Sequence, residues 1–150
     1  MSVKKKKKIS KRHKVGLTFG VFDLCHSGHL TLLMNAKSQC DQLIVYVSDD
    51  AYVRKHKGIT PLMPFEERKN IIESLKFVNI VGTQSVDFGK KEAVEKHKPD
   101  VLFVGDDWNK DTYTGMGLGV PVIFLPYTKT ISSTSLRKRI VRLLKSEIEK

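Results

Sequence analysis

Residues 15–29 read VGLTFGVFDLCHSGH, and this stretch decides the fold. It opens with a short, mainly apolar run that predicts a buried strand over 15–19. Gly20 lets the chain turn sharply as it leaves that strand. Apolar residues then recur at helical spacing from residue 28 to about residue 39. A buried strand followed by a tight turn and a helix is the repeating unit of parallel α/β proteins.

The same alternation of apolar strands and helices continues along the chain. Further strands are expected at 43–47, 79–81, 101–104 and 120–125, further helices from residue 64, at 90–98 and at 133–148, and loops at 54–63 and 108–119. Strands that are apolar throughout must be covered on both sides. The pattern therefore predicts an α/β fold: a Rossmann-like parallel sheet of about five strands with helices on both faces. Ligands of such sheets bind at the carboxyl ends of the strands, so chemistry is expected there.

The net charge of +11 is concentrated at the amino end of the chain. Residues 1–14 contain eight Lys and Arg residues and no Asp or Glu, so subtracting their charge leaves +3 for the remainder. A run of like charges repels itself, which predicts a disordered basic tail at 1–14 and one domain at 15–150. Three interpretations of the tail stay open: a solubilising extension, a non-specific contact with nucleic acid, or a contact with an anionic membrane surface.

Composition also indicates which partners and which cellular compartment to expect. No stretch holds enough consecutive apolar residues to cross a bilayer, so no membrane insertion is expected. The domain lacks the interleaved aromatic residues that stack on bases, so no specific nucleic-acid partner is expected. Cys25 and Cys40 match neither a metal-binding spacing nor a disulfide framework, which favours the reducing cytoplasm.

Two histidines follow the first strand in the pattern His26-Ser27-Gly28-His29. They are three residues apart, so they fall on the same side of the turn that opens the helix. Gly28 lets a phosphate approach the backbone, and the helix start offers free N–H groups and the positive end of its dipole. A single histidine near a helix start is commonly structural. Two of them facing such a phosphate seat favour a catalytic role.

The segment 20–29 resembles the signature of the cytidylyltransferase-like nucleotidyltransferase superfamily, and the resemblance extends over about residues 15–145. It is most similar to bacterial glycerol-3-phosphate cytidylyltransferases, which have stretches like those at 105–108 and 128–134. The resemblance implies that CTP and sn-glycerol 3-phosphate give CDP-glycerol and pyrophosphate by direct in-line attack on the α-phosphate. Residues 131–134 are also similar to adenylyltransferases. ATP, or another phosphorylated polyol, sugar or alcohol, therefore stays open as a substrate.

The resemblance also implies roles for individual residues. It gives catalytic roles to His26, His29 and Lys57. It gives nucleotide contacts to Gly20, Val21, Phe22, Asp23, His26, Gly28, His29, Lys57, Asp106, Tyr127, Thr128, Ile131, Ser132, Ser133 and Thr134. It gives contacts with the phosphorylated substrate to Lys55, Arg68 and Lys90, with Lys91 as the neighbouring alternative to Lys90. Tyr127 departs from the pattern, because the family's cytidylyltransferases have Arg at that place.

The resemblance further implies Mg²⁺ bound together with the nucleoside triphosphate, and a homodimer, which is common in the family. No metal site built from the protein alone is expected. A phosphomonoester is already anionic near neutral pH, since its second pKa is about 6. The reaction therefore needs no general base, and the obstacle is the repulsion between two anions. A non-catalytic nucleotide sensor would share the fold, but the intact histidine pair argues against it.

Overall fold

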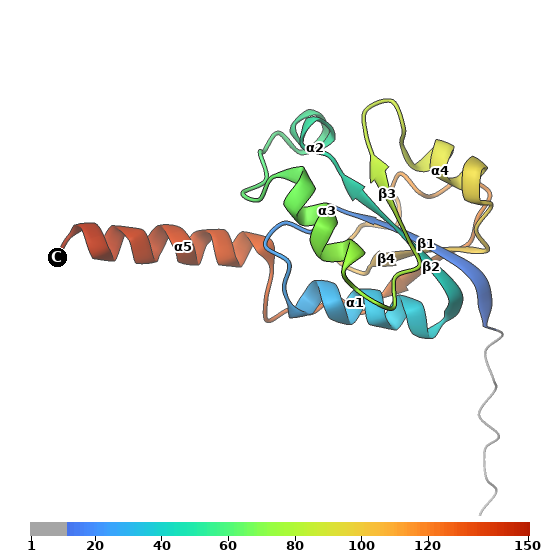
Figure 1. The fold of residues 1–150 in the computed structure, drawn as a ribbon, viewed down its shortest axis with the longest axis horizontal. Coiled ribbons are helices and arrows are strands. Elements are labelled where there is room, and N and C mark those ends of the chain that lie inside the picture. The colour runs from blue at the N-terminus through green and yellow to red at the C-terminus, as the bar shows by residue number, and fades with distance from the viewer. Residues whose placement is uncertain (1–11) are drawn as a thin grey trace, which may run out of the picture.

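The structure is a computed structural model, and it describes residues 12–150. It contains a 5-stranded sheet in the order β3-β2-β1-β4-β5, with every pair of neighbouring strands parallel. The strands are β1 (His13–Gly20), β2 (Cys40–Ser48), β3 (Ile80–Gln84), β4 (Val101–Gly105) and β5 (Val122–Leu125). The helices are α1 (Ser27–Ser38), α2 (Asp50–Lys57), α3 (Phe65–Glu73), α4 (Lys90–His97) and α5 (Ser133–Ile148). The predicted α/β, Rossmann-like class is confirmed (Figure 1).

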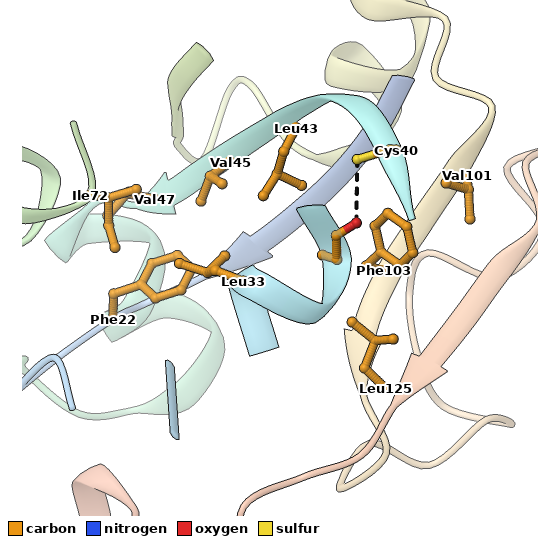
Figure 2. Close-up of a cluster of buried hydrophobic side chains, with 11 residues drawn as sticks. Phe22, Leu33, Cys40, Leu43, Val45, Val47, Ile72, Val101, Phe103 and Leu125 are labelled. Carbon is orange, nitrogen blue, oxygen red and sulfur yellow. Dashed lines mark hydrogen bonds between the residues drawn. The ribbon is translucent and has the colours of Figure 1, made fainter. Parts of the chain in front are cut away.

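Side chains of β2 alternate between the two faces of the sheet, as the unbroken apolar run predicts. Leu43, Val45 and Val47 pack in one cluster with residues of α1 and α3 (Figure 2). Ile44 and Tyr46 point to the other face, where they pack with residues of β1, β4 and α4. All five β2 side chains are buried or nearly so. Helices on both faces exclude water from this strand, which is why it carries no polar alternation.

The strand order reverses beside β1. The chain passes from β1 through α1 to β2 and on to β3, then crosses back through α4 to β4 on the other side of β1. The carboxyl ends of β1 and β4 therefore face a crevice between connections that diverge, which is where open α/β sheets bind ligands. Among residues 12–150, no helix combines the length and the apolar character that a membrane span requires.

Several boundaries differ from those expected from the sequence. β1 begins at His13, so residues 13 and 14 of the expected tail belong to the sheet, and residues 1–11 lie outside the described residues. β3 extends to Gln84 because Gly82 lets the strand pass the ring of Tyr46; an added Cβ would lie 2.4 Å from that ring. Residues 82–84 are not apolar, which is why the expected strand ended at residue 81.

The loop expected at 54–63 begins only at Gly58, because α2 runs to Lys57. The Asp49 carboxylate accepts a hydrogen bond from the Tyr52 N–H at 2.7 Å and caps the helix start. Gly58 ends the helix in a left-handed conformation, with φ 66°. Both cap signals are present in the sequence. The charged composition of the segment between them concealed the helix.

Candidate active site

A cavity of about 300 Å³ opens at the carboxyl ends of β1 and β4. The turn after β1, with His26 and His29, forms one wall, and the start of α5 from Ser132 to Thr134 forms another. The Ser133 hydroxyl donates a hydrogen bond to the Asp23 carbonyl at 2.6 Å and ties the two walls together. The structure thus places the turn with the histidine pair beside residues 132–134, to which the resemblance gave nucleotide contacts.

The two histidine rings are held in a fixed orientation by the backbone of α1. Nδ1 of His26 accepts from the Gly28 N–H at 3.0 Å, and Nδ1 of His29 accepts from the His26 N–H at 3.2 Å. The rings stack with centroids 3.9 Å apart. A ring nitrogen that accepts a hydrogen bond carries no proton, so each neutral imidazole carries its proton on Nε2. Both rings line the cavity, and each has an Nε2–H donor to offer there.

Burial keeps both imidazoles uncharged near neutral pH. The pKa of His29 is lowered to about 4, first by burial and then by the neighbouring His26. Burial also lowers the pKa of His26 from its ordinary value of 6.5. Two neutral imidazoles can offer hydrogen-bond donors but no charge, so positive charge at this cavity comes from lysines and helix starts.

The buried His29 makes stability depend on pH. Between about 6.5 and about 4 the unfolded chain takes up a proton that the folded chain does not, so the free energy of unfolding falls as the pH decreases through this window. The loss attributable to His29 is at most about 3 kcal/mol. Denaturant titrations from pH 7 to pH 4 of the wild type and of His29→Asn measure it, and the variant should lose less stability. An identical pH dependence in the two proteins would contradict the assignment.

Glycine is required at two positions of the first wall. A Cβ on Gly28 would lie 2.9 Å from Nδ1 of His26 and would push that ring from its cap. A Cβ on Gly20 would lie 2.7 Å from the ring of Phe22. Phe22 itself adopts a left-handed conformation, with φ 57°, which is rare for a bulky residue and strains the turn. With Val21 between them, Gly20 and Phe22 line the cavity as expected from the sequence.

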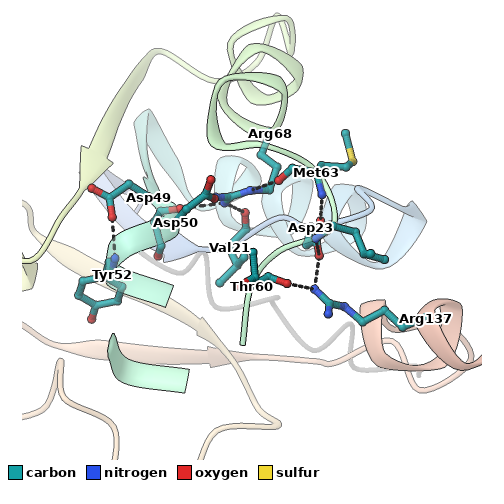
Figure 3. A network of polar contacts seen from close by, with 11 residues as sticks. Val21, Asp23, Asp49, Asp50, Tyr52, Thr60, Met63, Arg68 and Arg137 are labelled. Carbon is teal, nitrogen blue, oxygen red and sulfur yellow. Dashed lines mark hydrogen bonds and ion pairs between the residues drawn. The ribbon is translucent and has the colours of Figure 1, made fainter. Parts of the chain in front are cut away.

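Asp23 was expected to contact the nucleotide, but its carboxylate is engaged within the protein (Figure 3). It accepts hydrogen bonds from the Leu62 and Met63 N–H groups, each at 2.9 Å, and forms an ion pair with Arg137. Burial alone raises the pKa of Asp23, but the hydrogen bonds from Met63 and Leu62 and the guanidinium of Arg137 lower it overall. Asp23 therefore links the turn after β1 to the loop before α3 and to the first turns of α5.

Arg68 was expected to contact the phosphorylated substrate, but the structure buries it completely. Nη1 donates to the carbonyls of Val21 and Ser48 at 2.6 and 2.8 Å, and Nε donates to the Met63 carbonyl at 3.0 Å. Nη2 pairs with Asp50 at 2.5 Å (Figure 3). The guanidinium joins the ends of β1 and β2 and lines neither cavity of the site. Its placement gives Arg68 a structural role in place of the substrate contact implied by the resemblance.

Arg68→Lys should therefore act on stability more than on catalysis. Lys keeps the charge beside Asp50 but cannot satisfy three carbonyls with a planar fork, so we expect a loss of about 2 kcal/mol in the free energy of unfolding. Urea titration measures this loss, and steady-state kinetics at a temperature where the variant is folded should show kcat within about threefold of the wild type. A stable variant with a strongly raised KM would instead support a substrate contact.

A second cavity of about 220 Å³ adjoins the first, and Lys57 lines both. Lys90, at the start of α4, lines the second cavity, with Nζ 5.3 Å from the ring centroid of Phe19 and 5.5 Å from that of Tyr113. Burial and then the charge of Lys57 lower the pKa of Lys90. Local burial also lowers the pKa of Lys57 despite the nearby Asp107, although the residue as a whole is exposed, so this shift is weaker evidence than its position beside both cavities. An anion bound between these ammonium groups would relieve their repulsion.

Lys55 lies on α2 but outside the lining of both cavities. Residues two apart on a helix point to different sides, so Lys55 and Lys57 do not face the same ligand. The side chain of Lys55 is exposed. Its placement does not favour the substrate contact that was expected when this segment was assigned to a loop.

In the segments after β4 and β5, some residues hold the two strand ends together and others line the first cavity. Asp106 Oδ1 accepts from the Tyr127 N–H at 2.8 Å and joins the ends of the two strands. Asp107, not Asp106, lines the first cavity, together with Tyr127. Thr128 and Ile131 lie in the connection to α5 and do not line it. Asp107 and the oxygens of a triphosphate make a donor set that fits Mg²⁺, which commonly takes one or two carboxylates plus phosphates.

Gln84 is a candidate site residue that the sequence analysis missed. It lines the second cavity at the carboxyl end of β3 and is 2% exposed. Its Oε1 accepts from the Ser48 hydroxyl at 2.7 Å, while Nε2 has no hydrogen-bond partner within residues 12–150. A buried amide donor without a partner is costly unless something else satisfies it. The signal available in the sequence was a polar residue directly after a strand, but β3 was expected to end too early to reveal it.

Known proteins are similar to this chain in sequence and in fold. The family model described as Cytidylyltransferase-like matches residues 17–139. An FAD synthase of Pyrococcus abyssi (strain GE5 / Orsay) is 36% identical over 130 residues, which cover 83% of this chain and 88% of the relative. A glycerol-3-phosphate cytidylyltransferase of Bacillus subtilis (strain 168) is 34% identical over 128 residues, which cover 85% and 97%.

A solved structure has a similar fold. The crystal structure of the lipopolysaccharide core biosynthesis protein from Thermoplasma volcanium GSS1 matches with a TM-score of 0.64 at 26% identity and covers 79% of this chain and 99% of that chain. The family match spans β1 to the root of α5 and so contains both cavities. The chain therefore belongs to the cytidylyltransferase-like family of nucleotidyltransferases.

Proposed function

We propose that this enzyme transfers the cytidylyl group of CTP to sn-glycerol 3-phosphate, with CDP-glycerol and pyrophosphate as products. The observation that carries the proposal is the position of Lys57, which lines two adjoining cavities. The first cavity has the histidine pair and the start of α5 for a triphosphate. The second has Lys90 for a phosphomonoester. A reaction between two phosphate groups needs this arrangement, because both anions must be neutralised where they meet.

The proposed reaction is a direct displacement. An oxygen of the phosphomonoester attacks the α-phosphorus and forms a new P–O bond. The bond from the α-phosphorus to the bridging oxygen breaks, and its electron pair leaves with pyrophosphate. The attacking oxygen is already deprotonated near neutral pH, so no side chain has to remove a proton. No covalent enzyme intermediate is required.

Each group on the enzyme then has a distinct task. The Nε2–H groups of His26 and His29 donate to phosphoryl oxygens as charge grows on them. The hydroxyls and N–H groups at the start of α5 hold the phosphates that leave. Lys57 stands between the reacting groups, and Lys90 holds the acceptor phosphate. Mg²⁺ bound with the triphosphate would neutralise its charge, with Asp107 as the protein carboxylate in reach of it.

A nucleotide-by-acceptor panel tests the proposal. The full chain is incubated with CTP, ATP, GTP or UTP, each with glycerol 3-phosphate or another phosphomonoester, and pyrophosphate release and product mass are measured. CTP with glycerol 3-phosphate should give the highest kcat/KM, and glycerol without phosphate should give no product. Turnover that does not depend on a phosphomonoester would refute the mechanism. A different preferred pair would refute only the choice of substrates.

Adenylyl transfer is the second candidate function. Tyr127 lines the first cavity where the family's cytidylyltransferases have Arg, so the charge that such enzymes place there is missing. The similarity to an FAD synthase also favours adenylyl transfer, because FAD consists of an adenine nucleotide joined to a phosphorylated flavin. The panel therefore includes ATP with flavin mononucleotide and with phosphorylated sugars. A product containing adenine and no product from CTP would decide for this candidate.

Gln84 should contribute to binding of the acceptor. Replacing it with Leu removes the amide donor from the second cavity, and we expect the KM for the acceptor to rise about tenfold, equivalent to one hydrogen bond of about 1.4 kcal/mol. The KM for the nucleotide should change little. The net change in the free energy of unfolding should be small, because the variant removes the unpartnered amide donor but also removes the acceptor of the buried Ser48 hydroxyl. Steady-state kinetics with each substrate varied in turn provides the measurement, and equal changes in both KM values would argue against this role.

The cytoplasm is the proposed site of the reaction. Nucleoside triphosphates are abundant there, and Cys25 and Cys40 are both free thiols, as expected in a reducing compartment.

A further inference from the structure

Helix α5 extends away from the rest of the protein (Figure 1). It makes no extensive contact with any other helix or strand of residues 12–150. Five large apolar side chains of this helix are exposed: Ile140, Val141, Leu143, Leu144 and Ile148. A helix of this length is marginal in water by itself, and an apolar face stabilises it only when something covers that face. The match to the family ends at Arg139, so most of this surface lies beyond it.

The exposed residues form one stripe along α5. Steps of three and four residues place Arg137, Ile140, Leu144 and Glu147 along its centre line, as in a heptad seam. Leu136 and Leu143 flank this line on one side, and Val141 and Ile148 flank it on the other. Most of the remaining charges lie on the opposite face of the helix. The centre of the apolar stripe thus carries two charges of opposite sign, one near each end.

We propose that α5 is a dimerisation helix that packs antiparallel against α5 of a second copy of this chain. With the two-fold axis at the level of residue 142, Arg137 lies beside the second copy's Glu147, and Ile140 lies beside the second copy's Leu144. Every apolar residue of the stripe then meets an apolar residue. A parallel pair would place Arg137 beside Arg137 and Glu147 beside Glu147, which like-charge repulsion disfavours.

Arg137 is able to make this second contact. Its Nη2 donates to Asp23 and to the Thr60 carbonyl, while Nε and Nη1 make no hydrogen bond within residues 12–150. The side chain is 28% exposed, so its outer edge can reach a neighbouring helix. The charges at the two ends of the stripe are thus complementary only when a second copy lies antiparallel.

Glu147 also distinguishes a second copy from a membrane surface. The opposite face of α5 carries Lys138, Arg139, Arg142 and Lys145, as in helices that lie on anionic bilayers. A carboxylate in the centre of the apolar stripe would enter the bilayer without a partner, which is unfavourable. In the antiparallel pair the same carboxylate has Arg137 as its partner.

The oligomeric state of the full chain tests the proposal. Light scattering coupled to size exclusion across a dilution series should show a monomer–dimer equilibrium. Leu144→Glu places two carboxylates in the centre of the seam and should raise the dimer dissociation constant about hundredfold or more. Arg142→Glu, on the opposite face of the same helix, is the matched control and should leave the dimer intact. Nucleotidyltransferase activity or the unfolding transition of each variant shows that it is folded.

Glu147→Lys tests the orientation and the kind of partner together. In the antiparallel pair it sets Lys against Arg137 and should raise the dimer dissociation constant about tenfold or more. In a parallel pair the substitution replaces the repulsion between two Glu147 carboxylates with a repulsion between two lysines, so the dimer dissociation constant should change little. On vesicles of equal parts phosphatidylglycerol and phosphatidylcholine it should strengthen binding if α5 is a membrane helix. A monomer at all concentrations, a dimer that survives Leu144→Glu, or vesicle binding strengthened by Glu147→Lys would each overturn the proposal.

Discussion

Replacing His29 with Asn is expected to lower kcat about 10²–10³-fold, the range found when one oxyanion donor is removed. The Asn oxygen can still accept from the His26 N–H, as Nδ1 of His29 does at 3.2 Å, so the turn that opens α1 should persist. The Nε2–H that faces the first cavity is lost. The KM for the nucleotide should change less than kcat, because the donor acts mainly as charge grows in the transition state. Pre-steady-state and steady-state kinetics measure both parameters.

His29→Gln is the matched control for this experiment. Its amide nitrogen lies near the position of Nε2, so it restores a donor to the cavity while it loses the acceptor of the cap. We expect His29→Gln to keep at least about tenfold more activity than His29→Asn, one good hydrogen bond to a developing charge being worth this much or more. If the two variants lose activity equally, the cap and not the donor is what His29 supplies. Near-normal turnover of His29→Asn would remove His29 from the mechanism.

Lys57→Ala is expected to lower kcat/KM about 10²-fold or more, with an effect on both substrates. Lys57 lines both cavities, so its loss removes charge from the place where the two anions meet. Kinetics with each substrate varied in turn should therefore show losses for the nucleotide and for the acceptor. Lys90→Ala should instead act mainly on the acceptor, because Lys90 lines only the second cavity of the two.

Lys55→Ala is the matched control in the same helix. It removes the same charge two residues away, but Lys55 lines neither cavity. Its kcat/KM should remain within about twofold to threefold of the wild type, since an exposed charge is screened by salt. If Lys55→Ala and Lys57→Ala have similar effects, the two lysines act through long-range charge and not through contact at the site.

The local pattern of the sequence was sufficient for the class of fold and for the position of the cavity. The unbroken apolar run over 43–47 predicted a strand covered on both faces, and the structure covers it on both. The glycines and histidines after β1 predicted a phosphate seat at the start of α1, and the structure places both rings in a cavity there. These features depend on residues within one strand or one helical turn of each other.

Three charged residues were harder to assign. Arg68, Asp23 and Lys55 were all expected at the ligand, yet the structure engages the first two within the protein and points the third to solvent. The partners of Arg68 and Asp23 lie 18 to 114 residues away along the chain, apart from the Met63 carbonyl that Arg68 also contacts. Local spacing contains no information on such partners.

The sequence by itself determined the class of fold, the positions of the five strands along the chain, and the turn after β1 that carries the two histidines. These follow from periodicity, caps and turns, which are properties of neighbouring residues. Only the tertiary structure decided that Lys57 and not Lys55 lines the cavities and that Arg68 is buried. It also decided that, within residues 12–150, the amide donor of Gln84 has no partner and the apolar stripe of α5 is uncovered. The reason is that the direction of a side chain is set by the segments packed around it, and those segments meet only when the sheet is assembled.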